Sequence, residues 1–378
     1  TSARRNKNDE FYTVYEFIQK EVNAYLEYNP DVFRNKTILL PCDDPEWSNF
    51  TRFFAQNFET LGLKKLISTS FAANSKPANV PYQLTFFESD APQFDASKTR
   101  THGKIFTLTR KKSKSIDIDD LEWSYLEGDG DFRSEEVTAL RDEADIIITN
   151  PPFSLFREFV AWALETEKSL LIIGSQNAIT YKEIFPLICD NKLWLGVTCN
   201  DADMVFEVPE GTEVKQSDRE KAKKMGYEGN YTRLGNACWF TNIDHGRRHQ
   251  SIPLMTMSDN LKFSKHKTIQ TLGYSEYCNL KGCIEVPFVD AIPSDYSELM
   301  GVPITFVSKY CPEQFKIVGC ADADVLPDGW TGAPKHFVDL YYAQGNTGQY
   351  TEGNRLACYI DAEGTAKIPY KRIIIKSI

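Results

Sequence analysis

Residues Ala144–Thr149 form a short apolar run, Ala-Asp-Ile-Ile-Ile-Thr, which is followed at once by Asn150-Pro151-Pro152-Phe153. The run has the length and the β-branched content of a buried strand. Proline has no backbone N–H and a fixed φ, so two prolines in succession end the strand and leave the Pro151 carbonyl without a ladder partner. The end of the strand therefore carries a side-chain amide, a carbonyl and an aromatic ring within four residues.

These groups match the chemistry of a planar amine. The side-chain oxygen of Asn150 and the Pro151 carbonyl offer two acceptors for the two hydrogens of an exocyclic NH2 group, and Phe153 offers a flat surface for a ring. A flipped adenine would fit this set. The plainer interpretation is that Asn-Pro-Pro only starts a loop after a buried strand, and the tetrapeptide alone does not decide between the two.

The segment that follows favours the functional interpretation. Ser154 can cap a helix whose apolar residues recur at helical spacing, at Leu155, Phe156, Phe159, Val160, Ala163 and Leu164. A second apolar run, Leu170-Leu171-Ile172-Ile173, ends at Gly174. Two buried strands joined by an amphipathic helix indicate a βαβ crossover in a parallel sheet. Ligands gather beyond the carboxyl ends of such strands, where Asn150 would lie.

The composition predicts a globular protein with one large α/β domain and a smaller second one, since 42% of 378 residues are hydrophobic and 25% are charged. The sequence has no run of eighteen apolar residues, and residues 1–7 lack the apolar stretch of a signal peptide, so we expect a soluble, cytoplasmic protein without a membrane partner. Its nine cysteines contain no Cys-x-x-Cys pair. We expect reduced, mostly buried thiols and no metal, even at Cys278 and Cys283.

The formal net charge of −10 argues weakly against a nucleic-acid partner. The deficit lies in residues 1–244, because the remainder of the chain carries 14 Lys and Arg against 14 Asp and Glu. Basic clusters occur at residues 110–114, 221–224 and 247–249. Each cluster alone is more typical of a solvated surface than of a DNA contact.

The apolar periodicity predicts further elements on both sides of the central motif. Helices are expected at 9–28, from Phe50 to Gly62, and from Ser134; strands are expected at 37–40, 65–69, 123–126, 193–197, 204–208 and 234–242, with an inserted hairpin of 82–87 and 104–108. The charged stretch 209–232 is expected to be a mobile surface loop. A domain boundary near His245 gives domains 1–244 and 245–378.

Taken in order, these segments resemble the motifs of the EcoRI-type family of adenine-N6 DNA methyltransferases, over most of the chain. The N-terminal cofactor motif, the first-strand motif, the third-strand motif and the catalytic motif of that family resemble Asp9–Thr13, Cys42–Pro45, Gly130–Phe132 and Asn150–Phe153. Similar segments follow at 235–236, 239–242, 301–306 and 371–376.

The resemblance implies a Rossmann-like S-adenosylmethionine-dependent sheet followed by a C-terminal mixed α+β target-recognition domain. It implies transfer of a methyl group from S-adenosylmethionine to a flipped-out adenine in double-stranded DNA, with S-adenosylhomocysteine as product and no metal; we expect a monomer. The implied catalytic residues are Asn150, Pro151, Pro152 and Phe153. The implied cofactor-binding residues are Phe11, Tyr12, Thr13, Cys42, Asp43, Asp44, Asp131 and Phe132.

Each implied cofactor contact has a structural alternative. Tyr12 and Thr13 would hold the amino-acid end and Asp43 or Asp44 the ammonium, while Asp131 would accept from the adenine amine and Phe132 would pack on its ring. Equally, Asp43 and Asp44 can cap a helix, Asp131 can be a turn residue and Tyr12 a core side chain. The first-strand turn lacks the usual glycine, and the second strand ends without an acid for the ribose.

Two other classes of function remain open at this point. Asn-Pro-Pro followed by an aromatic residue also suits methylation of RNA adenine or of a protein glutamine. A non-catalytic DNA-binding relative that kept the fold is a further alternative, which the glycine-poor turn makes conceivable. The separate C-terminal domain favours DNA as the substrate.

Overall fold

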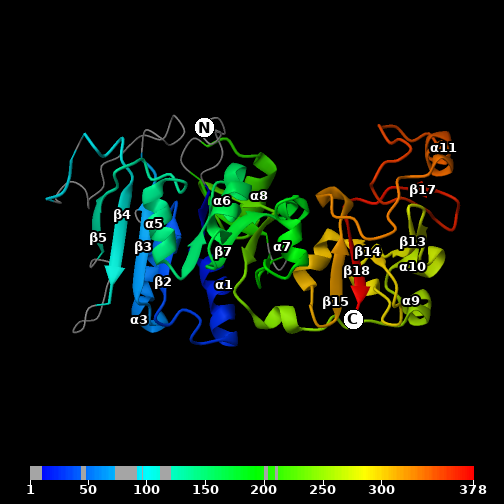
Figure 1. Ribbon diagram of the computed structural model, residues 1–378, viewed down its shortest axis with the longest axis horizontal. Helices are drawn as coiled ribbons and strands as arrows, with labels where there is room; N and C mark the ends of the chain where they lie inside the picture. The colour runs from blue at the N-terminus through cyan, green and yellow to red at the C-terminus, as the bar shows by residue number, and fades with distance from the viewer. Residues whose placement is uncertain are drawn as a thin grey trace. The chain divides into compact units, whose positions relative to one another are not determined.

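The structure is a computed structural model that describes residues 11–43, 48–72, 92–95, 97–110, 121–199, 203–208 and 212–378. The chain divides into two compact units, Thr1–Gln176 with Leu195–His245, and Asn177–Trp194 with Gly246–Ile378 (Figure 1). The second unit thus includes Asn177–Trp194, which the sequence places in the first domain. These residues join it because helix α7 (Phe185–Cys189) contacts strand β15 (Phe315–Gly319).

The first unit is built on an eight-stranded mixed sheet with the order β5-β4-β3-β2-β6-β7-β11-β8. Its centre is parallel, and strands β4, β5 and β11 run antiparallel to their neighbours. The strands are β2 (Thr37–Pro41), β3 (Lys65–Ser70), β4 (Lys104–Thr109), β5 (Glu122–Tyr125), β6 (Ile146–Thr149), β7 (Ser169–Ser175), β8 (Trp194–Leu195) and β11 (Ala237–Thr241). The predicted α/β class and βαβ crossover are confirmed.

Strand β6 is central because all of its side chains are buried, as those of β2 are. Ile146 is opposite Ile38 of β2 and Ser169 of β7. The Thr149 hydroxyl donates to the Pro41 carbonyl over 2.7 Å, which ties the carboxyl ends of β6 and β2 together. Because parallel strands end at the same edge of a sheet, this bond brings the segments after Pro41 and Thr149 side by side.

Helices cover this sheet as α1 (Tyr15–Tyr28), α2 (Asn49–Gln56), α3 (Phe58–Leu61), α5 (Glu135–Glu143) and α6 (Phe156–Leu164). The predicted cap at Ser134 is confirmed, since its hydroxyl accepts from the Val137 amide over 3.2 Å. The predicted cap at Ser154 is wrong: that residue lies inside a short 3-10 helix, Phe153–Leu155, and α6 starts after it. The chain turns tightly there because the Leu155 amide bonds the Pro152 carbonyl.

A small three-stranded sheet corrects three further predictions. It consists of β1 (Tyr12–Thr13), β9 (Met204–Glu207) and β10 (Tyr231–Leu234). Helix 9–28 therefore starts later than predicted, and 204–208 leaves the main sheet. Instead of a mobile loop, α8 (Gln216–Lys224) forms within 209–232, because its one buried residue, Ala222, packs with Val14 and Val205 while Lys221, Lys223 and Lys224 are exposed.

The predicted hairpin is only partly described. Residues 82–87 lie outside the described residues. Its other half, β4, pairs with β3 of the main sheet as well as with β5. The second half of the predicted hairpin is thus an ordinary strand of the main sheet.

The second unit contains a seven-stranded mixed sheet with the order β15-β18-β14-β13-β12-β16-β17. These strands, besides β15, are β12 (Glu276–Tyr277), β13 (Leu280–Glu285), β14 (Met300–Pro303), β16 (Tyr359–Ile360), β17 (Ala366–Lys367) and β18 (Arg372–Ser377). Its longer helices are α9 (Met257–Phe263), α10 (Lys267–Leu272) and α11 (Lys335–Ala343). The core of the sheet holds an ion pair, in which Arg372 contacts Glu285 at 2.7 Å.

All nine cysteines are free, and six of them are buried, so the prediction of mostly buried thiols is confirmed. Across the described ranges, no three His, Cys, Asp or Glu side chains gather in a way that can hold a metal ion. In the same ranges, no helix has both the length and the apolar character needed to cross a membrane.

Candidate functional site

Asn150 directly follows β6, and its amide is oriented by the N-terminal segment. The Nδ2 atom donates to the Phe11 carbonyl over 2.6 Å. A carbonyl can only accept, so the amide nitrogen must face Phe11 and the Oδ1 atom must point elsewhere. That Oδ1 atom is buried and has no hydrogen-bond partner in the described part of the chain. A buried acceptor without a donor costs about 1–3 kcal/mol, so the site keeps an acceptor in place at the expense of stability.

The aromatic part of the motif is also contacted by Phe11. The rings of Phe11 and Phe153 are stacked, with centroids 6.0 Å apart and an interplanar angle of 24°. Phe11 meets Phe206 of β9 edge-on at 5.9 Å, so the small sheet supports the pair. Pro151 is buried, whereas Pro152 and Phe153 are half-buried. Phe11 and Asn150, 139 residues apart in the chain, thus lie together, as do the two segments that resemble the family's cofactor and catalytic motifs.

Thr13 lies in β1 opposite Phe206, and the Thr13 carbonyl accepts from the Asn49 side chain over 2.9 Å. The Thr13 hydroxyl is buried, and no described residue hydrogen-bonds to it. Its neighbour Tyr12 is half-buried opposite Glu207. Thr13 therefore adds a second unpaired polar atom to the segment that holds Asn150.

The turn after β2 contains no glycine. Cys42 takes the left-handed conformation that glycine usually adopts, with φ 80°. This conformation is costly for a residue with a Cβ and is found where the surrounding structure enforces it. It is enforced through Asp43, whose carbonyl accepts from the hydroxyls of Thr51 (3.3 Å) and Ser68. Turn geometry here comes from two hydroxyl groups rather than from a glycine.

Asp43 is 5% exposed, and its Oδ1 atom accepts from the Ser48 hydroxyl over 2.7 Å. Ser48 itself caps α2 by accepting from the Phe50 amide over 3.1 Å. The capping role considered for Asp43 therefore belongs to Ser48. Asp44, the second candidate for the ammonium of the cofactor, lies outside the described residues.

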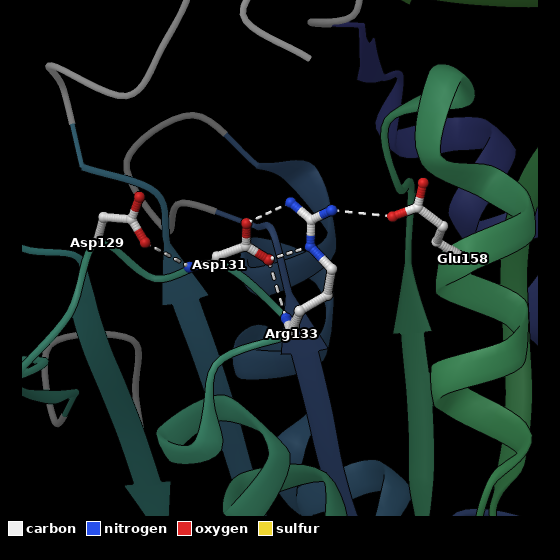
Figure 2. A network of polar contacts seen from close by, with 4 residues as sticks. All are labelled: Asp129, Asp131, Arg133 and Glu158. Atoms are coloured by element: carbon white, nitrogen blue, oxygen red, sulfur yellow. Dashed lines mark hydrogen bonds and ion pairs between the residues drawn. The ribbon is translucent and has the colours of Figure 1, made fainter. Parts of the chain in front are cut away.

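Asp131 is held by Arg133, as Figure 2 shows. The Oδ1 atom of Asp131 accepts from the Arg133 amide and Nε, each at 2.9 Å, and Oδ2 accepts from the guanidinium at 2.6 Å. Burial acts to raise the pKa of Asp131, but the hydrogen bonds and charge of Arg133 outweigh it and lower that pKa. Asp131 is thus an ionised acceptor that also closes the predicted turn.

Phe132 is a core residue, and the Arg133 guanidinium lies over its ring, 5.3 Å from the centroid. It is 3% exposed and packs edge-on against Phe159 and Trp162 of α6, with ring centroids 5.1 and 5.4 Å away. Little of its surface is left for another ring. The packing of Phe132 on the cofactor adenine stays a prediction.

The structure brings the first-strand and third-strand motifs close together. The pKa of the Cys42 thiol is raised by burial first and then by the nearby charges of Asp43 and Asp131. Sequence reasoning missed Asn49 and Arg133, whose contacts position Thr13 and Asp131. Arg133 follows the third-strand motif directly, a signal that was present; the contact of Asn49 with Thr13 is a tertiary one and left no signal.

Comparison with known proteins gives a consistent result. A family model described as adenine-specific methyltransferase EcoRI matches residues 1–378. Type II methyltransferase M.EcoRI of Escherichia coli is 38% identical over 317 residues, 84% of this chain and 87% of that protein. Type II methyltransferase M.MpnI of Mycoplasma pneumoniae is 32% identical over 319 residues, 84% of each chain. No solved structure is significantly similar.

Proposed function

Because the chain belongs to the EcoRI family of adenine-specific methyltransferases, we propose that the groups at the end of β6 hold the amine of a target adenine during methyl transfer. The chain is a site-specific DNA adenine methyltransferase of the Type II class. The observation that carries the proposal is the buried Oδ1 atom of Asn150: the Phe11 carbonyl orients its amide, and none of the described residues donates to the oxygen. An exocyclic amine is the donor that this acceptor lacks.

The chemistry of the motif follows from the acceptors. The N6 nitrogen is a poor nucleophile because its lone pair is conjugated with the ring. Hydrogen bonds from its two hydrogens to Asn150 Oδ1 and the Pro151 carbonyl favour a pyramidal nitrogen and stabilise the positive charge that develops on it. S-adenosylmethionine, when bound, supplies the electrophilic methyl group. No strong general base is needed, because the methylated, positively charged nitrogen can release one proton to water after the transfer, and alignment of the reacting atoms provides most of the rate.

Phe153 stacks on the extruded base in this proposal. The base must leave the duplex because stacking hides its amine, at a cost of a few kcal/mol. Phe153 is held by Phe11 on one side, so its ring is rigid before the base arrives. Pro152 fixes the approach by closing the 3-10 turn with Leu155. A ring already in place adds stacking energy without a further loss of side-chain entropy.

The proposed cofactor site combines Phe11, Tyr12 and Thr13 with Cys42, Asp43, Asp44, Asp131 and Phe132. Its donor set fits S-adenosylmethionine: a buried hydroxyl at Thr13 faces the amino-acid end, Asp43 or Asp44 accepts from the ammonium, and the ionised Asp131 accepts from the adenine amine. The carboxyl ends of β2 and β6 meet beside it, where α/β sheets bind ligands.

We further assign the unit that carries the eight-stranded sheet to a Rossmann-like methyltransferase domain, which is the predicted domain 1–244 without residues 177–194, and the second unit, the predicted domain 245–378 together with residues 177–194, to target recognition on double-stranded DNA. A surface of the second unit supports this. Phe263 is 70% exposed at the end of α9, and exposed Lys262 and Lys267 lie near it in the chain, while the exposed Lys265 between them pairs with Asp290 at 2.7 Å. Lysines neutralise phosphates, and an exposed ring can wedge between base steps. The monomeric state is part of the same proposal.

The test is Asn150→Ala, with Asn346→Ala as the matched control, since that amide also donates to a backbone carbonyl, that of Tyr341, over 2.9 Å. Tritium-methyl transfer to duplex DNA should fall about 100-fold or more in the first variant and stay unchanged in the second, while calorimetry shows cofactor binding by both. Unchanged turnover of Asn150→Ala would remove this residue from the mechanism.

The same assay separates the other classes of function. RNA and glutamine-containing peptides, offered in place of DNA, should accept no label. Label in either polymer at the rate seen for DNA would contradict the DNA assignment. A non-catalytic relative would show no cofactor binding by calorimetry.

A further inference from the structure

The carboxylate of Asp131 forms a hydrogen-bonded ion pair with Arg133, a residue to which the sequence motifs assign no role. We propose that Arg133 is the specificity-determining residue for the purine of the cofactor: it holds Asp131 as an acceptor whose Oδ2 atom receives a 6-amino group and rejects a 6-oxo group. The inference rests on the proposed contact between Asp131 and the cofactor adenine. It goes beyond that contact by naming the atom used and the residue that controls it.

The hydrogen bonds of the pair select the accepting oxygen. Oδ1 already accepts twice from Arg133, through the backbone amide and Nε, whereas Oδ2 accepts once, from the guanidinium at 2.6 Å. Each carboxylate oxygen has two acceptor positions. The remaining position in this network therefore lies on Oδ2, and a planar amine must approach there.

The loop that carries Asp131 is itself fixed. The Asp131 amide donates to Asp129 Oδ1 over 3.2 Å (Figure 2). The Asp129 carbonyl in turn accepts from the Ala72 amide over 2.8 Å. Gly130 has φ +84°, and a Cβ at this position would collide with the Ser70 carbonyl at the end of β3. Asp131 therefore has a defined position at the carboxyl end of the sheet before any ligand binds.

Glu158 holds the other side of the guanidinium. Its Oε2 atom accepts from Arg133 over 2.9 Å, and it lies on α6, the helix that follows the catalytic motif (Figure 2). The Glu158 side chain is 55% exposed, so water and salt screen this ion pair. Its contribution is to keep the plane of the guanidinium aligned with Asp131, and its loss should have a smaller effect than loss of Arg133.

Arg133 controls selectivity through protonation. An ionised carboxylate can only accept, so it pairs with the 6-amino group of adenine and faces the 6-oxo group of hypoxanthine as a second acceptor. Burial favours the neutral carboxyl, and the guanidinium overcomes that effect. Without Arg133, the pKa of Asp131 rises. At mildly acidic pH the protonated carboxyl can donate to a 6-oxo group, and the discrimination is lost.

The experiment measures binding of S-adenosylhomocysteine and S-inosylhomocysteine by calorimetry at pH 8 and pH 5.5. The variants are Arg133→Gln, Arg133→Lys and Glu158→Gln. Lys65→Gln is the control, because Lys65 pairs with Glu143 at 2.7 Å in the same unit, at the opposite ends of the strands. The wild type and the control should prefer the adenosine ligand at both pH values, with similar ratios.

Arg133→Gln should bind the adenosine ligand about 10-fold more weakly, and its preference should shrink from pH 8 to pH 5.5. Arg133→Lys, which keeps the charge, should restore the pH-independent preference, and Glu158→Gln should lose less than Arg133→Gln. A preference in Arg133→Gln that equals the wild-type ratio at both pH values would overturn the proposal, as would failure of Arg133→Lys to restore it in a folded protein.

Asp131→Ala separates this inference from the function on which it rests. If that variant binds both ligands as the wild type does, Asp131 does not contact the purine, and its assignment to the cofactor site falls together with the inference. If Asp131→Ala loses the preference but Arg133→Gln keeps it at both pH values, the cofactor assignment stands and the role of Arg133 alone is refuted.

Discussion

Replacement of Thr13 by valine should change folding stability and cofactor affinity in opposite directions. The Thr13 hydroxyl is buried, is 3% exposed as a residue and has no partner among the described residues. Valine has nearly the same shape and the same β-branch, so the pairing of β1 with β9 should persist. Removal of an unsatisfied buried hydroxyl should stabilise the free protein by about 1 kcal/mol.

The same substitution, Thr13→Val, should weaken binding of the cofactor. If the hydroxyl donates to the carboxylate of S-adenosylmethionine, its loss removes a hydrogen bond to a charged group, which is typically worth about 1.5–3 kcal/mol. The dissociation constant should therefore rise by roughly 10-fold to 150-fold. Thr13→Ser is the matched control, since it keeps the donor and loses only a methyl group.

The assays are urea unfolding without cofactor and calorimetric titration with S-adenosylhomocysteine. The reasoning predicts a higher unfolding midpoint and weaker binding for Thr13→Val, with near-normal binding for Thr13→Ser. A Thr13→Val protein that is less stable than the wild type, yet binds cofactor normally, would show that the hydroxyl serves the fold and that Thr13 is not a cofactor ligand.

Two other measurements follow from the second unit. Lys262→Gln should lower the slope of log K against log salt for DNA binding by about 0.9, and Phe263→Ala should weaken binding at all salt concentrations; an unchanged slope and affinity would exclude this surface from the interface. Hydrogen bonding from Cys358, together with His336, lowers the pKa of Cys278 to about 6. The thiolate fraction of Cys278 therefore rises as the pH passes through about 6. Iodoacetamide should label Cys278 at pH 7 and much more slowly at pH 5. Equal labelling rates at the two pH values would contradict the lowered pKa.

The sequence predicted the parts of the fold in which local pattern and tertiary environment agree. Short β-branched apolar runs such as Ile146–Ile148, stopped by prolines, favour a buried strand, because their side chains pack well in a sheet interior and the neighbouring strands pair the backbone. Ser134 was predicted as a cap because a hydroxyl before a helix satisfies a backbone N–H locally. The predictions failed where neighbours far along the chain decide, as with 204–208, which pairs with β1 instead of the main sheet.

The sequence did not predict helix α8, for a related reason. Its hydrophobic signal is a single buried alanine among charged residues, and a composition that is typical of a solvated loop is also typical of a helix with one buried position. The predicted cap at Ser154 was wrong because the Leu155 amide hydrogen-bonds to the Pro152 carbonyl. This bond places Ser154 inside a 3-10 helix rather than before an α-helix.

For the candidate site, the sequence by itself determined which chemical groups are available: an amide, two prolines and a ring after β6, a hydroxyl at Thr13 and a carboxylate at Asp131. Only the tertiary structure decided which of their atoms are free. The Phe11 carbonyl orients the Asn150 amide so that its oxygen meets no donor from the residues that the structure describes, and Arg133 occupies three of the acceptor positions on Asp131. The physical reason is that residue type sets the number of donors and acceptors, whereas the contacts made on folding set how many of them remain for a ligand.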